Sequence, residues 1–177
     1  RDLVPDPARW ERDGVAFRLV ERSGDGMPEE GDLRAVHDVL EGAFTDHFNS
    51  SEETFEEFLH RLREDPGHRW DHWWLAELLD GDEPEACGAL VGTVSEGTTG
   101  PDGSYVSYLG VLASARGRGV AKGLLNTIIA DAAERGRDRV GLEVDADSPT
   151  GAHGLYTSMG WGTKYVTESW HKDVPVE

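Results

Sequence analysis

The chain has 177 residues, and its 35 acidic side chains outnumber 17 Lys and Arg to give a net charge of −18. This length suits one globular domain with a hydrophobic core, and the apolar content of 37% with six tryptophans argues against a disordered acidic chain. Because phosphates and anionic membranes attract clustered Lys and Arg, we expect neither nucleic acid nor a membrane as a partner. The charge is uneven: residues 1–100 carry 25 acidic and 9 basic side chains, and residues 101–177 carry 10 and 8.

The single cysteine, Cys87, excludes an internal disulfide and predicts a reducing compartment, so we expect a cytoplasmic protein. No apolar run reaches the ~18 residues that a membrane span needs, and no signal peptide is visible. The chain begins at Arg1 without a methionine, as expected of a trimmed chain or of part of a longer polypeptide.

The first third of the sequence predicts one strand and two helices. Residues 1–14 suggest an irregular lead-in, 15–20 a strand, and the Gly- and acid-rich segment 23–31 a loop. Apolar residues at helical spacing from Leu33 to Phe44 predict a helix with Asp32 as N-cap. A second helix follows, with Ser50 or Ser51 as N-cap and an apolar stripe of Phe55, Phe58, Leu59 and Leu62.

The remaining elements begin with a hairpin of residues 73–79 and 87–95, followed by a strand at 105–112. A helix at 120–134, a strand at 140–144, a short helix at 149–158 and a closing strand or strand pair at 161–170 come next. The buried face of the 120–134 helix is expected to hold Leu124, Leu125, Ile128, Ile129 and Ala132. The order β-α-α-β-β-β-α-β-α-β predicts an α/β (α+β) fold, a mixed, mostly antiparallel sheet with helices on both faces, as a single domain over residues 1–177.

The most informative segment joins the 105–112 strand to the 120–134 helix through Arg116-Gly117-Arg118-Gly119. Free backbone N–H groups at a helix N-terminus form an anion site, and glycines let an anion approach the backbone closely. Together with Lys122, the two arginines make this the most basic patch of the chain. A Gly-rich turn with a solvated basic patch is the alternative interpretation.

Two common phosphate loops fail on spacing. Lys122 precedes Gly123, whereas a Walker A loop needs the lysine after the glycine, directly before Ser or Thr. Gly117, Gly119 and Gly123 give G-x-G-x-x-x-G, one residue longer than the dinucleotide fingerprint. A dinucleotide-binding oxidoreductase fragment is therefore the least favoured interpretation.

Three segments resemble a known family. Arg116-Gly-Arg-Gly119-Val-Ala121 is similar to the R/Q-x-x-G-x-G/A pyrophosphate loop of the GNAT superfamily of acyl-CoA-dependent N-acyltransferases. Leu142-Glu-Val-Asp-Ala-Asp-Ser148 resembles that family's strand after the loop helix, and Leu155-Tyr156-Thr-Ser-Met-Gly160-Trp161 resembles the end of its short helix. The element order resembles the family fold over essentially the whole chain.

The resemblance implies roles for particular residues. The backbone of Leu109, Gly110 and Val111 would pair with the pantetheine of acetyl-CoA. The loop and helix start would hold its pyrophosphate with Arg116, Gly117, Arg118, Gly119, Val120, Ala121 and Lys122. Tyr156 would protonate the departing thiolate as general acid, since a phenol of pKa ~10 can donate within hydrogen-bond reach. A core aromatic at a helix end is the alternative for Tyr156.

The general base is less well defined by the sequence. Ser107 and Tyr108 stand where many family members carry a glutamate, and Glu143, on the following strand, is the other candidate. A surface carboxylate is the alternative for Glu143, and a water chain could also take the proton. Ser148 replaces the family's asparagine and would contact the cofactor or cap the short helix.

The other reactive side chains fit structural roles better. Cys87 lies in an apolar run and is expected to be a buried core thiol, because direct transfer needs no nucleophilic cysteine. Only His68 and His72 are four residues apart, beside Pro66-Gly67, so we expect no metal site. The resemblance implies that acceptor-site residues include His47, Phe48, Trp73 and Trp74, with core and surface aromatics as the alternative.

These observations predict an acetyl-CoA-dependent N-acetyltransferase for a small amine or peptide amine. The acidic half of the chain predicts a cationic acceptor, with solubility as the alternative reason for the charge. A catalytically silent acyl-CoA-binding module, or half of a tandem acetyltransferase, remains the second hypothesis. The sequence leaves the oligomeric state open, homodimers being common in the family.

Overall fold

The computed structural model describes residues 6, 9–44, 53–65, 68–97, 99–144 and 151–168. The chain divides into two compact units, residues 1–143 and 144–177, and each is described by itself. The prediction of one domain over residues 1–177 stays a prediction. None of the helices in these described ranges is long and apolar enough to cross a membrane.

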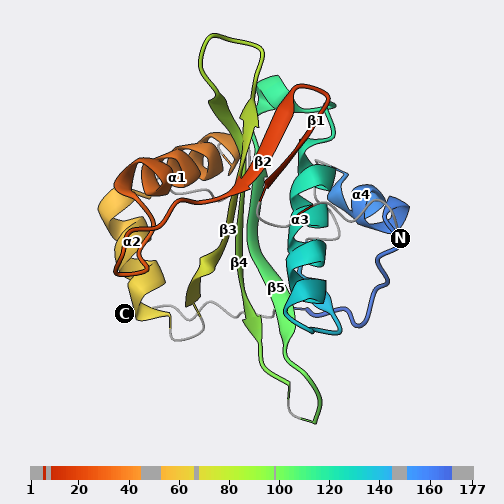
Figure 1. The fold of residues 1–177 in the computed structure, drawn as a ribbon. Helices are drawn as coiled ribbons and strands as arrows, with labels where there is room; N and C mark the ends of the chain where they lie inside the picture. Colours follow the sequence, from red (N-terminus) through yellow and green to blue (C-terminus); the bar gives the residue numbers. More distant parts are fainter. Residues whose placement is uncertain are drawn as a thin grey trace, which may run out of the picture. The chain divides into compact units, whose positions relative to one another are not determined.

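A six-stranded sheet organises the first unit, with the strands side by side in chain order (Figure 1). β1 (Arg9–Arg12), β2 (Val15–Leu19), β3 (His68–Leu78), β4 (Glu85–Ser95) and β5 (Gly103–Val111) are antiparallel to their neighbours. β6 (Val140–Leu142) pairs with β5 in parallel. The sheet is therefore mixed and mostly antiparallel, as predicted.

Helices cover both faces of this sheet (Figure 1). α1 (Glu30–Phe44) and α2 (Phe55–Glu64) lie on one face, and α3 (Val120–Glu134) lies on the other. Glycines allow the close approach: a Cβ on Gly110 would lie 3.0 Å from Leu40 of α1, and one on Gly88 would lie 2.6 Å from Val120 of α3. The predicted two-faced helix cover is confirmed.

The core on the α1/α2 face is a cluster of buried aliphatic and aromatic side chains. The capping box at the start of α2 orients that helix, since Thr54 accepts from the Glu57 N–H while the Glu57 carboxylate accepts from the Thr54 N–H. The cluster consists of Val20, Leu33, Val36, Val39, Leu40, Phe58, Leu59, Leu62, Trp73, Leu75, Ala89 and Val91.

Several predicted boundaries need correction. The lead-in holds a strand, β1, joined to β2 by a two-residue turn in which Asp13 (φ +52°) and Gly14 (φ +75°) both take the left-handed conformation. Asp32 lies inside α1 and does not cap it, because its carboxylate is bound to the partly buried Arg18 at 2.7 Å and 2.9 Å. Thr54 caps α2, so the prediction of Ser50 or Ser51 as N-cap is wrong; both serines lie outside the described residues.

α3 has the predicted bounds, although one residue of its predicted buried face is exposed. Ile129 is 38% exposed, whereas Leu124, Leu125, Ile128 and Ala132 are buried. The drift of a 3.6-residue period places Ile129 at the edge of the buried stripe.

The second unit contains α4 (Ala152–Ser158), which begins after Gly151 in a left-handed conformation. No strand is present at 161–168, so the predicted closing strand is not seen in the described part of 161–170. Tyr165 and Val166 are 64% and 81% exposed, and alternating burial, which stabilises a strand, is missing.

Candidate active site

In the described part of the chain, the loop before α3 contains two glycines with open space at their Cβ positions. Gly117 (φ +81°) and Gly119 (φ +78°) adopt left-handed conformations, and a Cβ at either position would meet nothing within 4 Å. Gly119 is the N-cap of α3, and the N–H of Gly123 donates to its carbonyl at 2.9 Å. The amides of Val120, Ala121 and Lys122 therefore have no acceptor within the helix and can bind an anion.

The three basic side chains of this loop differ in their surroundings. The Arg118 guanidinium forms an ion pair with Asp80, at the start of the β3–β4 turn, through both carboxylate oxygens. The Nε of exposed Arg116 lies 3.4 Å from the carbonyl oxygen of Val111. Lys122 is exposed on the first turn of α3. The basic patch expected from the sequence is thus partly neutralised, because Asp80 balances Arg118.

The edge of β5 opens beside this loop. The pairing of β5 with β6 covers only Ser104 to Val106 and ends at the Val106–Leu142 pair. Beyond that pair Leu109, Gly110 and Val111 remain in the register of β4 alone, and a β-bulge shifts that register after Val91. Among the residues that the structure describes, no strand pairs with this edge of β5 beyond Val106, so its backbone groups there can bind an extended ligand.

The two predicted catalytic side chains lie in different units. Glu143 follows the last residue of β6 in the first unit and is exposed. Tyr156 lies on α4 in the second unit, its ring centroid 5.9 Å from that of Trp161. Burial raises the pKa of Tyr156 above its usual value, which keeps the phenol protonated. Ser148 lies outside the described residues.

A family model of acetyltransferases, the GNAT family, matches residues 33–161, which is more than two thirds of the chain. The chain belongs to the GNAT family of acetyltransferases. The matched residues include the glycine loop before α3 and strands β5 and β6.

Solved structures with similar folds include several acetyltransferases. The aminoglycoside antibiotic 6'-N-acetyltransferase AAC(6')-Ih from Acinetobacter baumannii is 14% identical (TM-score 0.62, covering 92% of this chain and 100% of that chain). The ribosomal-protein-alanine N-acetyltransferase from Brucella melitensis is 15% identical (TM-score 0.60, covering 89% and 99%). The NatC complex bound to Gag peptide and CoA is 17% identical (TM-score 0.63, covering 82% of each chain). A search of curated proteins finds no match.

Two of the residues proposed for the acceptor site are core residues of this GNAT acetyltransferase. Trp73 and Trp74 are fully buried, and Trp73 packs edge-on against Phe58 of α2 with ring centroids 5.9 Å apart. Their side chains do not line an open site, so the alternative interpretation as core aromatics holds for both. His47 and Phe48 lie outside the described residues.

A polar bridge between α2 and β5 was not foreseen from the sequence. Arg61 donates to the Tyr108 hydroxyl at 2.6 Å and forms an ion pair with Glu53 at 2.7 Å. Its guanidinium also lies over the ring of Tyr108, 5.1 Å from the centroid. The bridge fixes α2 against β5. The only sequence signal for this contact is the position of Arg61 on the predicted second helix.

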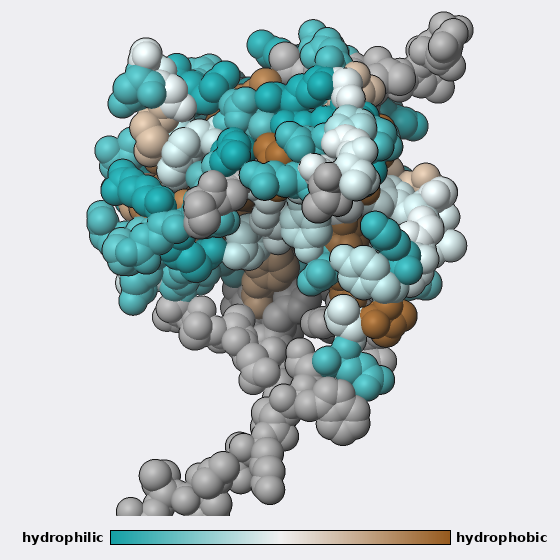
Figure 2. Space-filling view, turned by 90° about the horizontal axis from the view of Figure 1, so that it is seen from below, coloured by the Kyte–Doolittle hydropathy of each residue, from teal (hydrophilic) through white to brown (hydrophobic). Residues whose placement is uncertain are grey.

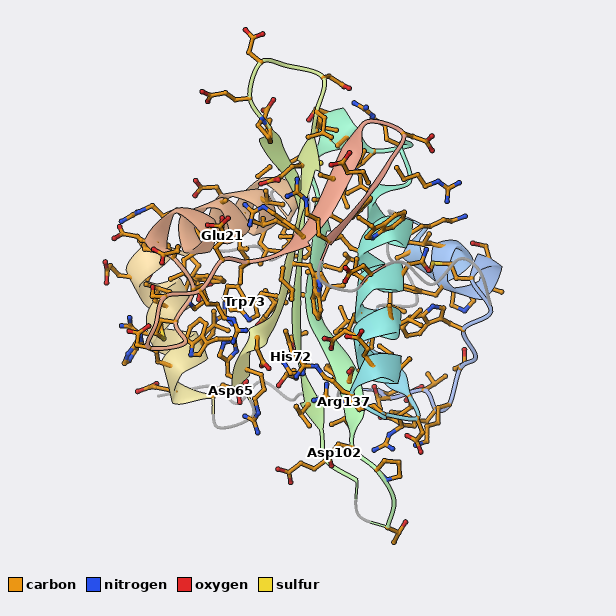
Figure 3. The ribbon with its side chains drawn as sticks, in the orientation of Figure 1. Glu21, Asp65, His72, Trp73, Asp102 and Arg137 are labelled. Atoms are coloured by element: carbon orange, nitrogen blue, oxygen red, sulfur yellow. The ribbon has the colours of Figure 1, made fainter. Side chains whose placement is uncertain are left out.

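His68 and His72 lie in separate environments. His72 is 1% exposed: its Nδ1 lies 2.6 Å from Asp71, and its Nε2 accepts from Arg137 at 2.6 Å (Figure 3). His68 packs against Trp70 and Trp73, and burial lowers its pKa to about 4. Within the described ranges no three His, Cys, Asp or Glu side chains are grouped as a metal site would require. Cys87 is a buried thiol whose pKa burial raises to about 11.

Proposed function

We propose that this GNAT protein transfers the acetyl group of acetyl-CoA to a primary amine of a cationic small molecule or peptide. The observation that carries the proposal is the open loop at Gly117 and Gly119, which sets free helix amides beside an unpaired strand edge. Helix amides suit a pyrophosphate, and a strand edge suits the amide groups of pantetheine. Both features belong to a chain of the acetyltransferase family.

The loop and strand would bind the cofactor through backbone groups. The amides from Gly117 to Lys122 would hold the pyrophosphate, with Arg116 adding positive charge, and Arg118 stays paired with Asp80. The backbone of Leu109, Gly110 and Val111 would hold the pantetheine. Such fixed donors orient the thioester without side-chain rearrangement.

The chemistry is direct attack of the amine on the thioester carbonyl. Glu143 or a water chain would take the ammonium proton, since Glu143 is exposed and open to a cationic ligand. A backbone N–H near Val111 would stabilise the oxyanion, and the C–S bond would then break. Tyr156 would give its proton to the leaving thiolate, and because burial raises its pKa the phenol carries that proton at neutral pH.

The charge distribution supports a cationic acceptor. The excess of acidic side chains lies in residues 1–100, whereas residues 101–177, which contain the loop, are close to neutral. Figure 2 shows that hydrophilic residues make up most of the face seen from below. An acidic field attracts cations and is screened by salt, so we expect kcat/KM for the acceptor to fall as ionic strength rises.

A thiol-release assay with a panel of amines tests the proposal. We expect release with cationic amines and, for Tyr156→Phe, a loss of about a hundredfold in kcat with CoA affinity unchanged. Tyr165→Phe is the matched control, because Tyr165 is largely exposed in the same unit. CoA binding without thiol release for any acceptor would favour the silent binding module, and a preference for neutral amines would remove the electrostatic argument.

A further inference from the structure

The loop before α3 is tied to a distant turn through the side chain of Arg118. Arg118 stands between Gly117 and Gly119, whose missing side chains leave the loop without other packing partners within 4 Å at those positions. Its Nη1 and Nη2 donate to the two oxygens of Asp80, the Nη2–Oδ1 distance being 3.0 Å. A planar guanidinium bound in this bidentate way has a fixed orientation.

The partner of Arg118 is itself held by the neighbouring turn. The N–H of Leu79, the residue before Asp80, donates to the carbonyl of Gly14 at 2.9 Å. The Asp13 carbonyl lies 3.5 Å from Nη2 of Arg118. A Cβ on Gly14 would lie 3.2 Å from the Asp80 carboxylate and 3.3 Å from Arg118, so a glycine leaves room for the pair.

We propose that Asp80 is a positioning residue for the cofactor loop, acting through Arg118. By holding the guanidinium against the β1–β2 and β3–β4 turns, Asp80 fixes the backbone of Gly117 and Gly119 and keeps the α3 amides open to the pyrophosphate. Position 118 is a variable place in the glycine motif: the family resemblance places its backbone at the pyrophosphate, but it assigns no role to the pairing of the Arg118 side chain with Asp80. The inference rests on the proposed use of acetyl-CoA.

This role differs from direct binding of phosphate by Arg118. If Arg118 bound phosphate itself, Asp80 would compete for it, and removing the Asp80 charge would tighten CoA binding. If Asp80 positions the loop, removing that charge weakens CoA binding. The two roles therefore predict opposite signs for one substitution.

The test is the dissociation constant of CoA, measured by calorimetry for Asp80→Asn, Arg118→Gln and the double variant. We expect each single variant to weaken CoA binding about fivefold, the upper end for an exposed ion pair. The double variant should lose no more than either single one, because both act through the same contact. We expect Asp80→Glu, which keeps the carboxylate, to restore most of the affinity, and kcat at saturating acetyl-CoA to stay unchanged.

Asp82→Asn is the matched control, since it removes the same charge from an exposed position in the same turn. Tighter CoA binding in Asp80→Asn, additive losses in the double variant, or an equal loss in Asp82→Asn would overturn the positioning role. Unchanged CoA affinity in Asp80→Asn would overturn the positioning role and leave the proposed function standing. A wild-type chain that binds no CoA would overturn both. Thermal unfolding of each variant checks that the fold is retained.

Discussion

An arginine at each end of α3 forms an ion pair with an aspartate, one in β3 and one in the turn that follows β3, and the two aspartates differ in exposure. At the loop end Arg118 pairs with Asp80, whose side chain is 58% exposed. At the far end Arg135 pairs with Asp71 at 2.9 Å and also with Asp131, whose side chain is 6% exposed. The two arginine side chains are equally exposed, at 31% and 32%, so the two ends differ in their aspartates, because Asp71 is 33% exposed and Asp131 is buried whereas Asp80 is mostly exposed.

The far end is a connected network of polar groups. Asp71 binds both Arg135 and His72, and Arg137 donates to His72 and to the buried Ser104 at 2.8 Å. Figure 3 shows His72 and Arg137 close together in the lower part of the sheet. Each buried side chain of this network has a partner, so the network fixes this end of α3.

Asp71→Asn should cause the largest loss of stability. An amide has one acceptor oxygen, so His72 or Arg135 would lose its partner in a partly buried network. We expect the free energy of unfolding to fall by about 3 kcal/mol. Chemical denaturation measures it, and a loss below about 1 kcal/mol would show that the two ends of α3 do not differ as described.

Acid should destabilise the fold through two histidines of β3, His68 and His72. The folded-state pKa of His68 is depressed to about 4, and burial also lowers that of His72, so unfolding takes up protons below the usual histidine pKa. Stability is therefore present above about pH 6.5 and lost as pH falls toward 4, by about 2 kcal/mol for His68. The raised pKa of His37 opposes this loss.

Denaturation of His68→Gln across this pH range checks the prediction. The variant should show a shallower decline of stability than the wild-type chain. His60→Gln is the control, because His60 is exposed on α2. If the stability of the wild-type chain and of His68→Gln declined equally with falling pH, His68 would not be a source of the acid sensitivity.

The middle of α3 should tolerate no extra methyl group. A Cβ on Gly123 would lie 2.0 Å from Cζ of the buried Phe17 ring, so Gly123→Ala must displace that ring. We expect a loss of about 2 kcal/mol, even after the gain in helix propensity. Gly31→Ala in α1, where nothing lies within 4 Å, should be close to neutral in the same unfolding measurement.

Asp80→Asn should have the smallest effect on stability. Its carboxylate is mostly exposed, and an exposed ion pair contributes little to stability because solvent and salt screen it. Comparing its unfolding free energy with that of Asp71→Asn, the same substitution at the other end of β3, tests the contrast directly. If Asp80→Asn lowered the free energy of unfolding as much as Asp71→Asn, the two ends of α3 would not differ in the way described.

Sequence patterns predicted the elements whose signals are local. The helical spacing of Leu124, Leu125 and Ile128 predicted α3 with its observed bounds. The glycines of the loop predict an anion site there. β1 was missed because Arg9–Arg12 is largely polar, although the Asp13-Gly14 turn is a strong hairpin signal that could have revealed it.

Contacts between distant residues could not be predicted in this way. The Arg118–Asp80 pair joins residues 38 apart, and Arg137 and His72 are 65 apart, so no local spacing encodes either contact. The same limit applies to Trp73, whose large aromatic ring fits an acceptor site or a core equally well by type. The sheet register decides between them.

The proposed function depends on binding of the acetyl-CoA pyrophosphate by the backbone amides from Gly117 to Lys122. Backbone amide resonances of an isotope-labelled chain, followed while CoA is added, test it most directly. We predict saturable shifts at Gly117, Gly119 and the first turn of α3, with the amides of Asp71 and His72 unmoved. Saturable CoA binding that leaves the loop amides unshifted would contradict the claim.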